Sequence, residues 1–421
     1  MHILRRVTIL ALIFLAHTAY SQDFYLDIIK DSTLVRSGKK MNGFKQGLWV
    51  YRDAQKNYVA SGYFVDGTPD STWFLYKNNQ ATERVSLRNG EKNGPYVVFD
   101  DAGAVILETF YESNILDGRY IEYYPAGSPA LTGYYDQGKK DSIWIEYSPY
   151  GLKNFIQMYK KGISMGEWYY YHSNGKVSIK ENYLNGYLSG ERVEYYKNGG
   201  VAVKSHYKYG VLNGAYEEYF ENGNLSAKGK FVSGQKDDVW INMTENNTVY
   251  SMGSYKNDLK HGHWKYFYPS GALELEGDFL NDQKNGQWME YYQSGKLKSI
   301  GSFHLDLKNG LWGRFYENGQ LLQDENWAFG HLMEVSEFFT AKGDALPKGT
   351  LKQGNGIRYA YYPSGVLKSE ENFVGGYAEG VAKYYFDNGN LESTGEFKDN
   401  EPTGTWIYYN QRGKIILEKD F

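Results

Sequence analysis

A period of 24 residues runs through almost the whole chain of 421 residues, and it constrains the fold more than any other feature. One unit opens Gly-His-Trp-Lys-Tyr-Phe-Tyr-Pro-Ser-Gly-Ala-Leu at Gly262, and a similar pattern returns at Gly286 and at Gly310. Sixteen openings can be placed from residue 47 to residue 404, and only one step of 23 and one of 22 residues break the spacing. A fixed period of this kind indicates a repeat protein and overrides a domain count based on length.

Each unit contains the signals of two strands and two turns. Counted from the opening residue, position 3 is usually Trp or Tyr, and positions 6 and 18 are aromatic in nearly every unit. Positions 9 and 10 are often Asn-Gly, and a second turn signal falls near positions 20 and 21. Asn-Gly between aromatic and β-branched runs predicts a hairpin, because both residues accept positive φ. We therefore expect an all-β chain, an elongated single-layer antiparallel β-meander of tandem 24-residue β-hairpin repeats.

The expected register assigns the side chains to two faces. If positions 9 and 10 form a two-residue turn, position 7 opposes 12, 5 opposes 14, 3 opposes 16 and 1 opposes 18. The Trp at 3, the Tyr at 7, the Leu at 12 and the aromatic at 18 then share one structural face. Position 16 is often Gly, so a Trp ring can lie over bare backbone there. The tryptophans predicted to be structural are Trp168, Trp264, Trp288, Trp312 and Trp406.

Position 6 points to the other face, among Lys, Glu and Ser. Tyrosine there is explained either by cross-strand packing on a half-exposed sheet or by a repeated aromatic platform for a protein or glycan. The second explanation makes these rings a candidate binding face, and two in adjacent units would lie about 10 Å apart, two strand spacings. The residues of this candidate face are Tyr171, Tyr195, Tyr219, Tyr291, Tyr361 and Tyr385.

The N-terminus reads as a secretory signal peptide. Arg5 and Arg6 precede a nearly all-apolar stretch from Val7 to Ala16, and small residues at Ala19 and Ser21 suit a cleavage site. The predicted organisation is a signal peptide over 1–21, an N-terminal cap or partial repeat over 22–46, repeats 1–12 over 47–327, a degenerate repeat 13 over 328–355, and repeats 14–16 over 356–421. We expect export to the periplasm, the outer surface or the medium, and no transmembrane segment.

The pattern Gly-x-Trp-x-x-Tyr-Tyr-x-Asn-Gly-x-Leu, followed by Gly-x-Phe and Asn-Gly, resembles the MORN repeat in its bacterial variant form. The resemblance covers about residues 43–421, in about 16 tandem copies. It implies single-layer hairpin arrays used as scaffolds, with protein and sometimes lipid contacts. Bacterial chains of this kind are often labelled YwqK-type antitoxins.

Chemical motifs are scarce in the sequence. The chain has no cysteine and a formal net charge of −4 without long one-sign runs, so we expect no disulfide, no thiolate site and no nucleic-acid partner. The pair His261 and His263 lacks a recurring third ligand, and the acidic residues lack calcium-site spacing. No nucleophile elbow or phosphate-binding loop occurs. We therefore expect no catalytic, cofactor or metal site.

These observations favour an exported, non-enzymatic β-repeat scaffold that mediates protein–protein interaction at the bacterial envelope or outside the cell. A glycan-binding repeat array and a YwqK-type antitoxin or immunity partner of a toxin are the alternatives. The partner's identity does not follow from the sequence.

Overall fold

The computed structural model describes residues 24–421, and the signal-peptide prediction lies outside the described residues. Apart from the short helix α2 (Phe24–Lys30), the regular elements are strands, arranged as a 29-stranded, a two-stranded and a six-stranded sheet. Consecutive strands pair antiparallel as hairpins, which confirms the all-β hairpin-repeat fold. The described chain divides into two compact units, residues 24–200 with Tyr207–Gly210, and Val201–His206 with Val211–Phe421.

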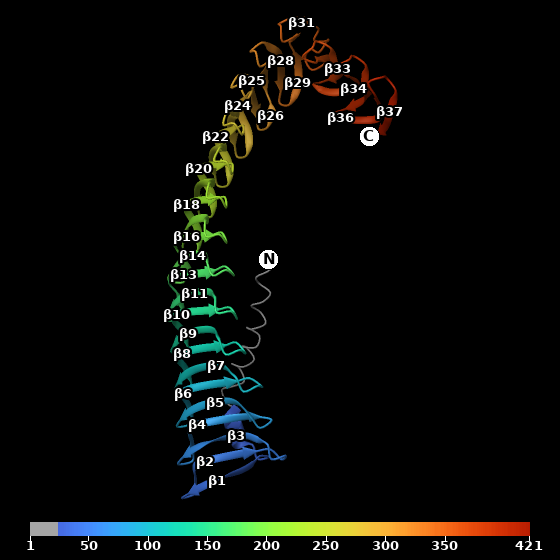
Figure 1. Cartoon of the computed structure of the whole chain (residues 1–421). Coiled ribbons are helices and arrows are strands. Elements are labelled where there is room, and N and C mark those ends of the chain that lie inside the picture. The colour runs from blue at the N-terminus through green and yellow to red at the C-terminus, as the bar shows by residue number, and fades with distance from the viewer. Residues whose placement is uncertain (1–23) are drawn as a thin grey trace. The chain divides into compact units, whose positions relative to one another are not determined.

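The first unit holds the strands up to β16, and its hairpins follow one another in a single layer (Figure 1). Their bounds are β1 (Val35–Met41), β2 (Phe44–Arg52), β3 (Tyr58–Val65), β4 (Thr68–Lys77), β5 (Gln80–Arg88), β6 (Glu91–Phe99), β7 (Val105–Glu112), β8 (Ile115–Tyr123), β9 (Pro129–Asp136), β10 (Lys139–Tyr147), β11 (Lys153–Lys160), β12 (Ile163–Ser164), β13 (Gly166–Tyr171), β14 (Val177–Leu184), β15 (Tyr187–Leu188) and β16 (Gly190–Tyr195).

The division between the units falls in β17 (Val201–Lys208), and the second unit holds the remaining strands. Their bounds are β18 (Val211–Tyr219), β19 (Leu225–Val232), β20 (Gln235–Met243), β21 (Val249–Lys256), β22 (Leu259–Phe267), β23 (Leu273–Leu280), β24 (Gln283–Tyr291), β25 (Leu297–His304), β26 (Leu307–Lys308), β27 (Gly310–Phe315), β28 (Leu321–Ala328), β29 (His331–Val335), β30 (Phe338–Phe339), β31 (Ala345–Leu346), β32 (Gly356–Tyr361), β33 (Leu367–Val374), β34 (Tyr377–Tyr385), β35 (Leu391–Lys398), β36 (Glu401–Tyr409) and β37 (Ile415–Asp420).

The register within a unit confirms most of the expected pairing. In the repeat from Gly262, position 1 opposes 18 (Gly262 and Phe279), position 3 opposes 16 (Trp264 and Gly277), and position 5 opposes 14. A bulge after position 5 then places position 6, not 7, opposite 12. The prediction that position 12 shares the Trp face is therefore wrong. In the first repeats, the position-12 ring of Tyr58 contacts the position-6 ring of Tyr76 at 5.4 Å, on the other face.

The turn inside most hairpins also differs from the expectation of two residues at positive φ. Tyr268 donates its backbone N–H to Ala272, which encloses a three-residue loop in which Gly271 has a φ of 86°. Only position 10 needs the left-handed conformation. The Asn at position 9 instead accepts a hydrogen bond from a backbone N–H two residues later and donates to a carbonyl of the next hairpin, as Asn318 does with Gln320 and Ala341.

The turn between repeats is the one with two residues in the left-handed region. Asn257 and Asp258, at positions 20 and 21, have φ values of 53° and 69° and connect β21 to β22. Such a turn matches the twist of the flanking strands, which explains the turn residues at these positions. The step of 23 residues arises because Asn78 and Asn79 make the same two-residue turn inside the hairpin of β4 and β5.

Candidate functional site

The five tryptophans predicted to be structural are buried at position 3 of their own repeats, where they are between 1% and 7% exposed; Trp168 belongs to the first unit and Trp406 to the six-stranded sheet. Each indole contacts the aromatic ring at position 18 of a neighbouring strand. Trp288, for example, meets Phe279 edge-on at 5.0 Å. The indole N–H also has a fixed partner, since Trp288 Nε1 donates to the carbonyl of Asp278 at 3.1 Å. The structural role of these residues stays a prediction until their removal is measured.

Under most of the tryptophans lies a glycine of the preceding repeat; Trp168 is the exception, because position 16 of the repeat before it is Gln157. A Cβ built on Gly277 would lie 2.3 Å from the ring of Trp288, and one on Gly301 would lie 2.0 Å from Trp312. Where position 3 is Tyr, the preceding position 16 carries a side chain, as in the pair Thr109 and Tyr120. The Trp–Gly association in the sequence is thus a contact between successive repeats, and it locks one hairpin to the next.

A lysine two residues before the opening position covers the exposed side of the indole. In the second unit four successive repeats carry this lysine, with the ammonium nitrogen 4.3 to 4.8 Å from the ring centroid. Cation–π attraction stabilises this arrangement. We call these side chains the lysine ladder: Lys236, Lys260, Lys284 and Lys308.

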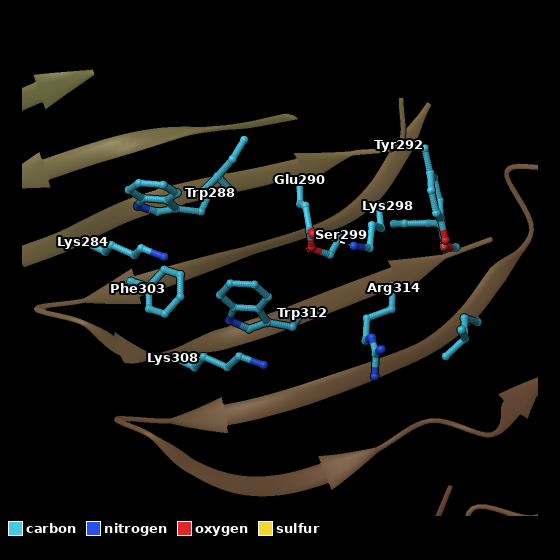
Figure 2. A pocket seen from close by; sticks show the side chains of 13 residues that line it. Lys284, Trp288, Glu290, Tyr292, Lys298, Ser299, Phe303, Lys308, Trp312 and Arg314 are labelled. Atoms are coloured by element: carbon cyan, nitrogen blue, oxygen red, sulfur yellow. Dashed lines mark hydrogen bonds and ion pairs between the residues drawn. The ribbon is translucent and has the colours of Figure 1, made fainter. Parts of the chain in front are cut away.

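A pocket of about 420 Å³ opens on this tryptophan face between β23 and β28. Figure 2 shows Lys284 and Lys308 toward one side, Tyr292 at the opposite side, and Glu290, Lys298 and Arg314 between them. Four cationic side chains and one carboxylate line it, and Lys298 is paired with Glu290 at 2.6 Å. The pocket therefore carries a surplus of positive charge.

Tyrosines at position 7 form a second row beside the pocket. The hydroxyl of Tyr292 donates to the carbonyl of Phe315 at 2.8 Å, and Tyr268 and Tyr316 make the same bond to the repeat that follows each of them. The phenol tip is thereby fixed to the next hairpin. Tyr292 lines the same pocket as Trp288, as expected from the predicted face of position 7.

The position-6 tyrosines of the candidate binding face are all partly buried. The hydroxyl of Tyr291 donates to Glu276 at 2.8 Å. Burial is the main cause that raises the pKa of Tyr291 to about 12, and this hydrogen bond is the second cause. Glu276 lies at position 15, so this tyrosine points away from the tryptophan face. The backbone at position 6 has a second task, because the carbonyl of Tyr195 is the partner of His172 Nε2. Nothing in the geometry shows a ligand on these rings.

The same second face carries large apolar side chains in several repeats of the first unit. Positions 2 and 17 oppose each other there, and both are apolar in the pairs Leu48 with Tyr63 and Ile143 with Met158. In the second unit the same positions hold polar pairs such as His263 with Asp278, or mixed pairs such as Leu311 with Asn326. The large apolar side chains of the first unit are between 37% and 53% exposed, and we call them the apolar columns: Leu48, Tyr63, Phe110, Tyr134, Ile143 and Met158.

Chemistry-bearing groups elsewhere are engaged in the fold. His263 lies 3.0 Å from Asp278 and 3.2 Å from Glu276. Across residues 24–421, no group of three His, Asp or Glu side chains could hold a metal ion. Within the same range, none of the helices has the length and apolar character needed to cross a membrane.

Comparison with protein families identifies the repeats. Eight segments match the MORN repeat variant: residues 166–185, 188–209, 212–232, 260–281, 284–304, 308–328, 355–374 and 378–399. These eight segments, which lie between residues 166 and 399, coincide with β-hairpins described above and are MORN-variant repeats. No curated protein matches the chain.

Solved structures offer only weak similarity. A mutant of S. aureus TarM in complex with fondaparinux, alpha-GlcNAc-glycerol and UDP shares 14% identity at a TM-score of 0.17 over 38% of this chain and 24% of that one. TcdB2-TccC3 shares 10% sequence identity at a TM-score of 0.14, and the match covers 88% of this chain and 27% of that one. A Photorhabdus luminescens Tc holotoxin pore shares 9% identity at a TM-score of 0.14, over 94% of this chain and 28% of that one. The chain thus spans about a quarter of the length of these proteins.

Sequence reasoning missed the lysine ladder and the hydrogen bonds of the position-7 tyrosines. Both were detectable, because the same 24-residue spacing that reveals the tryptophans also relates Lys236 to Lys308 and Tyr268 to Tyr316.

Proposed function

We propose that this protein is an exported, non-enzymatic β-repeat scaffold that binds a protein at the bacterial envelope or outside the cell. Its hairpins outside the eight matched segments are then diverged copies of the same repeat, about sixteen in all. The observation that carries the proposal is the set of apolar columns on the second face of the first unit. Groups of exposed apolar side chains are typical of protein interaction sites. The columns are interrupted once, by the polar pair Thr72 and Ser86 between Tyr63 and Phe110.

The geometry of the apolar columns suits a protein partner. Tyr134 lies opposite Arg119, and Phe110 opposite Pro95, so large rings alternate with smaller or polar side chains across the strands. Aromatic, Met and Arg side chains are enriched at protein interfaces. Of the position-6 tyrosines, Tyr171 and Tyr195 belong to the first unit and extend this surface with rings that present polar tips.

The proposal predicts that partner capture depends on these columns and not on the stability of the sheet. A Tyr134→Ser, Met158→Ser variant removes two exposed side chains, so its melting temperature should stay close to that of the parent chain. Capture of the partner from the native envelope fraction by the purified protein should be lost. Tyr171→Ser with Tyr195→Ser tests the position-6 tyrosines in the same assay.

The matched control is Leu311→Ser, at position 2 of the second unit. This side chain is 65% exposed but opposes Asn326 instead of an apolar residue. The control should retain the partner. Full capture by the Tyr134→Ser, Met158→Ser variant would overturn the proposed surface. Fractionation of the native cell tests export separately. A cytoplasmic location would overturn the proposed export and favour the alternative that the protein is an antitoxin.

A further inference from the structure

The pocket on the tryptophan face combines charge and fixed aromatic rings in a way that the apolar columns do not. Lys284, Lys308 and Arg314 line it, and Glu290 is already paired with Lys298. The buried Glu325 lies 3.6 Å from Lys308 and 4.0 Å from Arg314, so two carboxylates stand against the four cationic side chains of the pocket. The side chains of Lys298 and Arg314 are 43% and 51% exposed, so their charged ends are accessible to a ligand. This is the charge pattern expected for an anionic ligand.

The groups around the pocket repeat with the period of the hairpins. The lysine ladder supplies one ammonium group per repeat, and Tyr268, Tyr292 and Tyr316 supply one fixed ring per repeat. Successive repeats are two strands apart, which is about 10 Å. A ligand that fits several repeats at once must therefore be linear and carry an equivalent anionic group at about this interval.

The row of position-7 tyrosines favours a sugar polymer over a polypeptide as the ligand. The hydroxyls of the position-7 tyrosines are occupied by backbone carbonyls, so these residues offer ring surface held in one orientation. Rings fixed in this way bind with little loss of side-chain entropy. The C–H faces of pyranose rings stack on such surfaces. A linear disaccharide is similar in length to one repeat, whereas an extended acidic peptide places carboxylates about every 3.3 Å.

We propose that the tryptophan face of residues 236–322 binds a linear acidic polysaccharide with one acidic sugar per disaccharide. Its carboxylates or sulfates meet the lysine ladder together with Lys298 and Arg314, and its sugar rings lie toward the position-7 tyrosines. The pocket volume of about 420 Å³ is within the usual range for a ligand site and accommodates a short stretch of the polymer.

The test uses the purified chain and a hyaluronan octasaccharide, in which acidic and neutral sugars alternate. Binding should be measurable by calorimetry at low salt and should weaken as salt rises, because the contacts are charged. A neutral N-acetylated chito-oligosaccharide of the same length and poly-L-glutamate serve as the other two probes. Neither should bind comparably. Equal binding of poly-L-glutamate would overturn the proposal in favour of an acidic protein segment, and equal binding of the neutral sugar would overturn the role of charge.

Two variants locate the binding. Lys298→Gln with Arg314→Gln should weaken hyaluronan binding about tenfold or more, because two charged contacts are lost. The matched control is Lys265→Gln with Lys383→Gln, which removes two charges of 43% and 46% side-chain exposure from position 4 on the other face. The control should bind like the parent. An unchanged affinity in the first variant, or an equal loss in the control, would overturn the site without touching the proposed protein-binding columns.

Discussion

Within the second unit, the repeats from 238 to 327 differ from the junction that follows them. In the former, each contact between successive repeats places a Trp at position 3 on a Gly at position 16, as Trp288 lies on Gly277. At the junction Arg358 occupies position 3 and Glu325 occupies position 16, and their side chains meet at 2.8 Å. An indole on bare backbone is thus replaced by a buried ion pair.

The junction spans a break in the sheet. β28 pairs with β29, but β30 and β31 form a separate two-stranded sheet, and β32 begins the six-stranded sheet. Glu325 is 3% exposed and also lies 3.6 Å from Lys308 and 4.0 Å from Arg314. A small hydrophobic cluster of Leu332, Val335, Leu351 and Phe373 packs nearby.

The comparison teaches that the same two positions carry the contact between repeats whether the side chains are apolar or charged. The first unit has a second example, since Arg192 at position 3 meets Glu181 at position 16 at 3.2 Å. A buried apolar side chain is stabilised by its removal from water and needs no specific partner group, whereas a buried charge depends on its counter-ion. The two kinds of contact should therefore respond differently to mutation.

Trp288→Ala should give the largest loss, about 3–5 kcal/mol, because it empties the space of a buried indole. The damage should stay local, since each repeat contacts only its neighbours. Limited proteolysis should show new cleavage between about residues 262 and 334 and unchanged cleavage elsewhere. Unaltered cleavage in that segment would contradict the structural role of the tryptophan.

Glu325→Ala should cost about 3 kcal/mol, because it removes the 2.8 Å partner of Arg358 and leaves this largely buried guanidinium only the longer contact with Glu371 at 3.8 Å. The informative control is the double variant Glu325→Met, Arg358→Met, which removes both charges and should recover much of the lost stability. Thermal melting compares the three proteins. A double variant as unstable as Glu325→Ala would mean that the junction depends on shape and not on charge compensation.

Much of the tryptophan contact could be predicted from the sequence, whereas the junction could not. Periodicity fixed which positions share a face, because side chains alternate along a strand. The periodicity could not reveal the bulge after position 5, because the extra residue, Glu274 between Leu273 and Leu275, recurs in each repeat and leaves the period unchanged. The partner of Glu325 escaped prediction for another reason: 33 residues separate it from Arg358, and the degenerate segment between them hides the register.

Gly277→Ala should have the smallest of these effects, about 1–3 kcal/mol, the usual cost of overpacking. The added Cβ would lie 2.3 Å from the indole of Trp288, which is 2% exposed and has little room to move. The comparison variant is Ser302→Ala on the other face, which changes a strand residue that already carries a Cβ. Tryptophan fluorescence and thermal melting should detect a loss only in the first variant. Equal stability of the two variants would show that the indole can shift to make room for a Cβ, and that the ring does not require glycine at position 16.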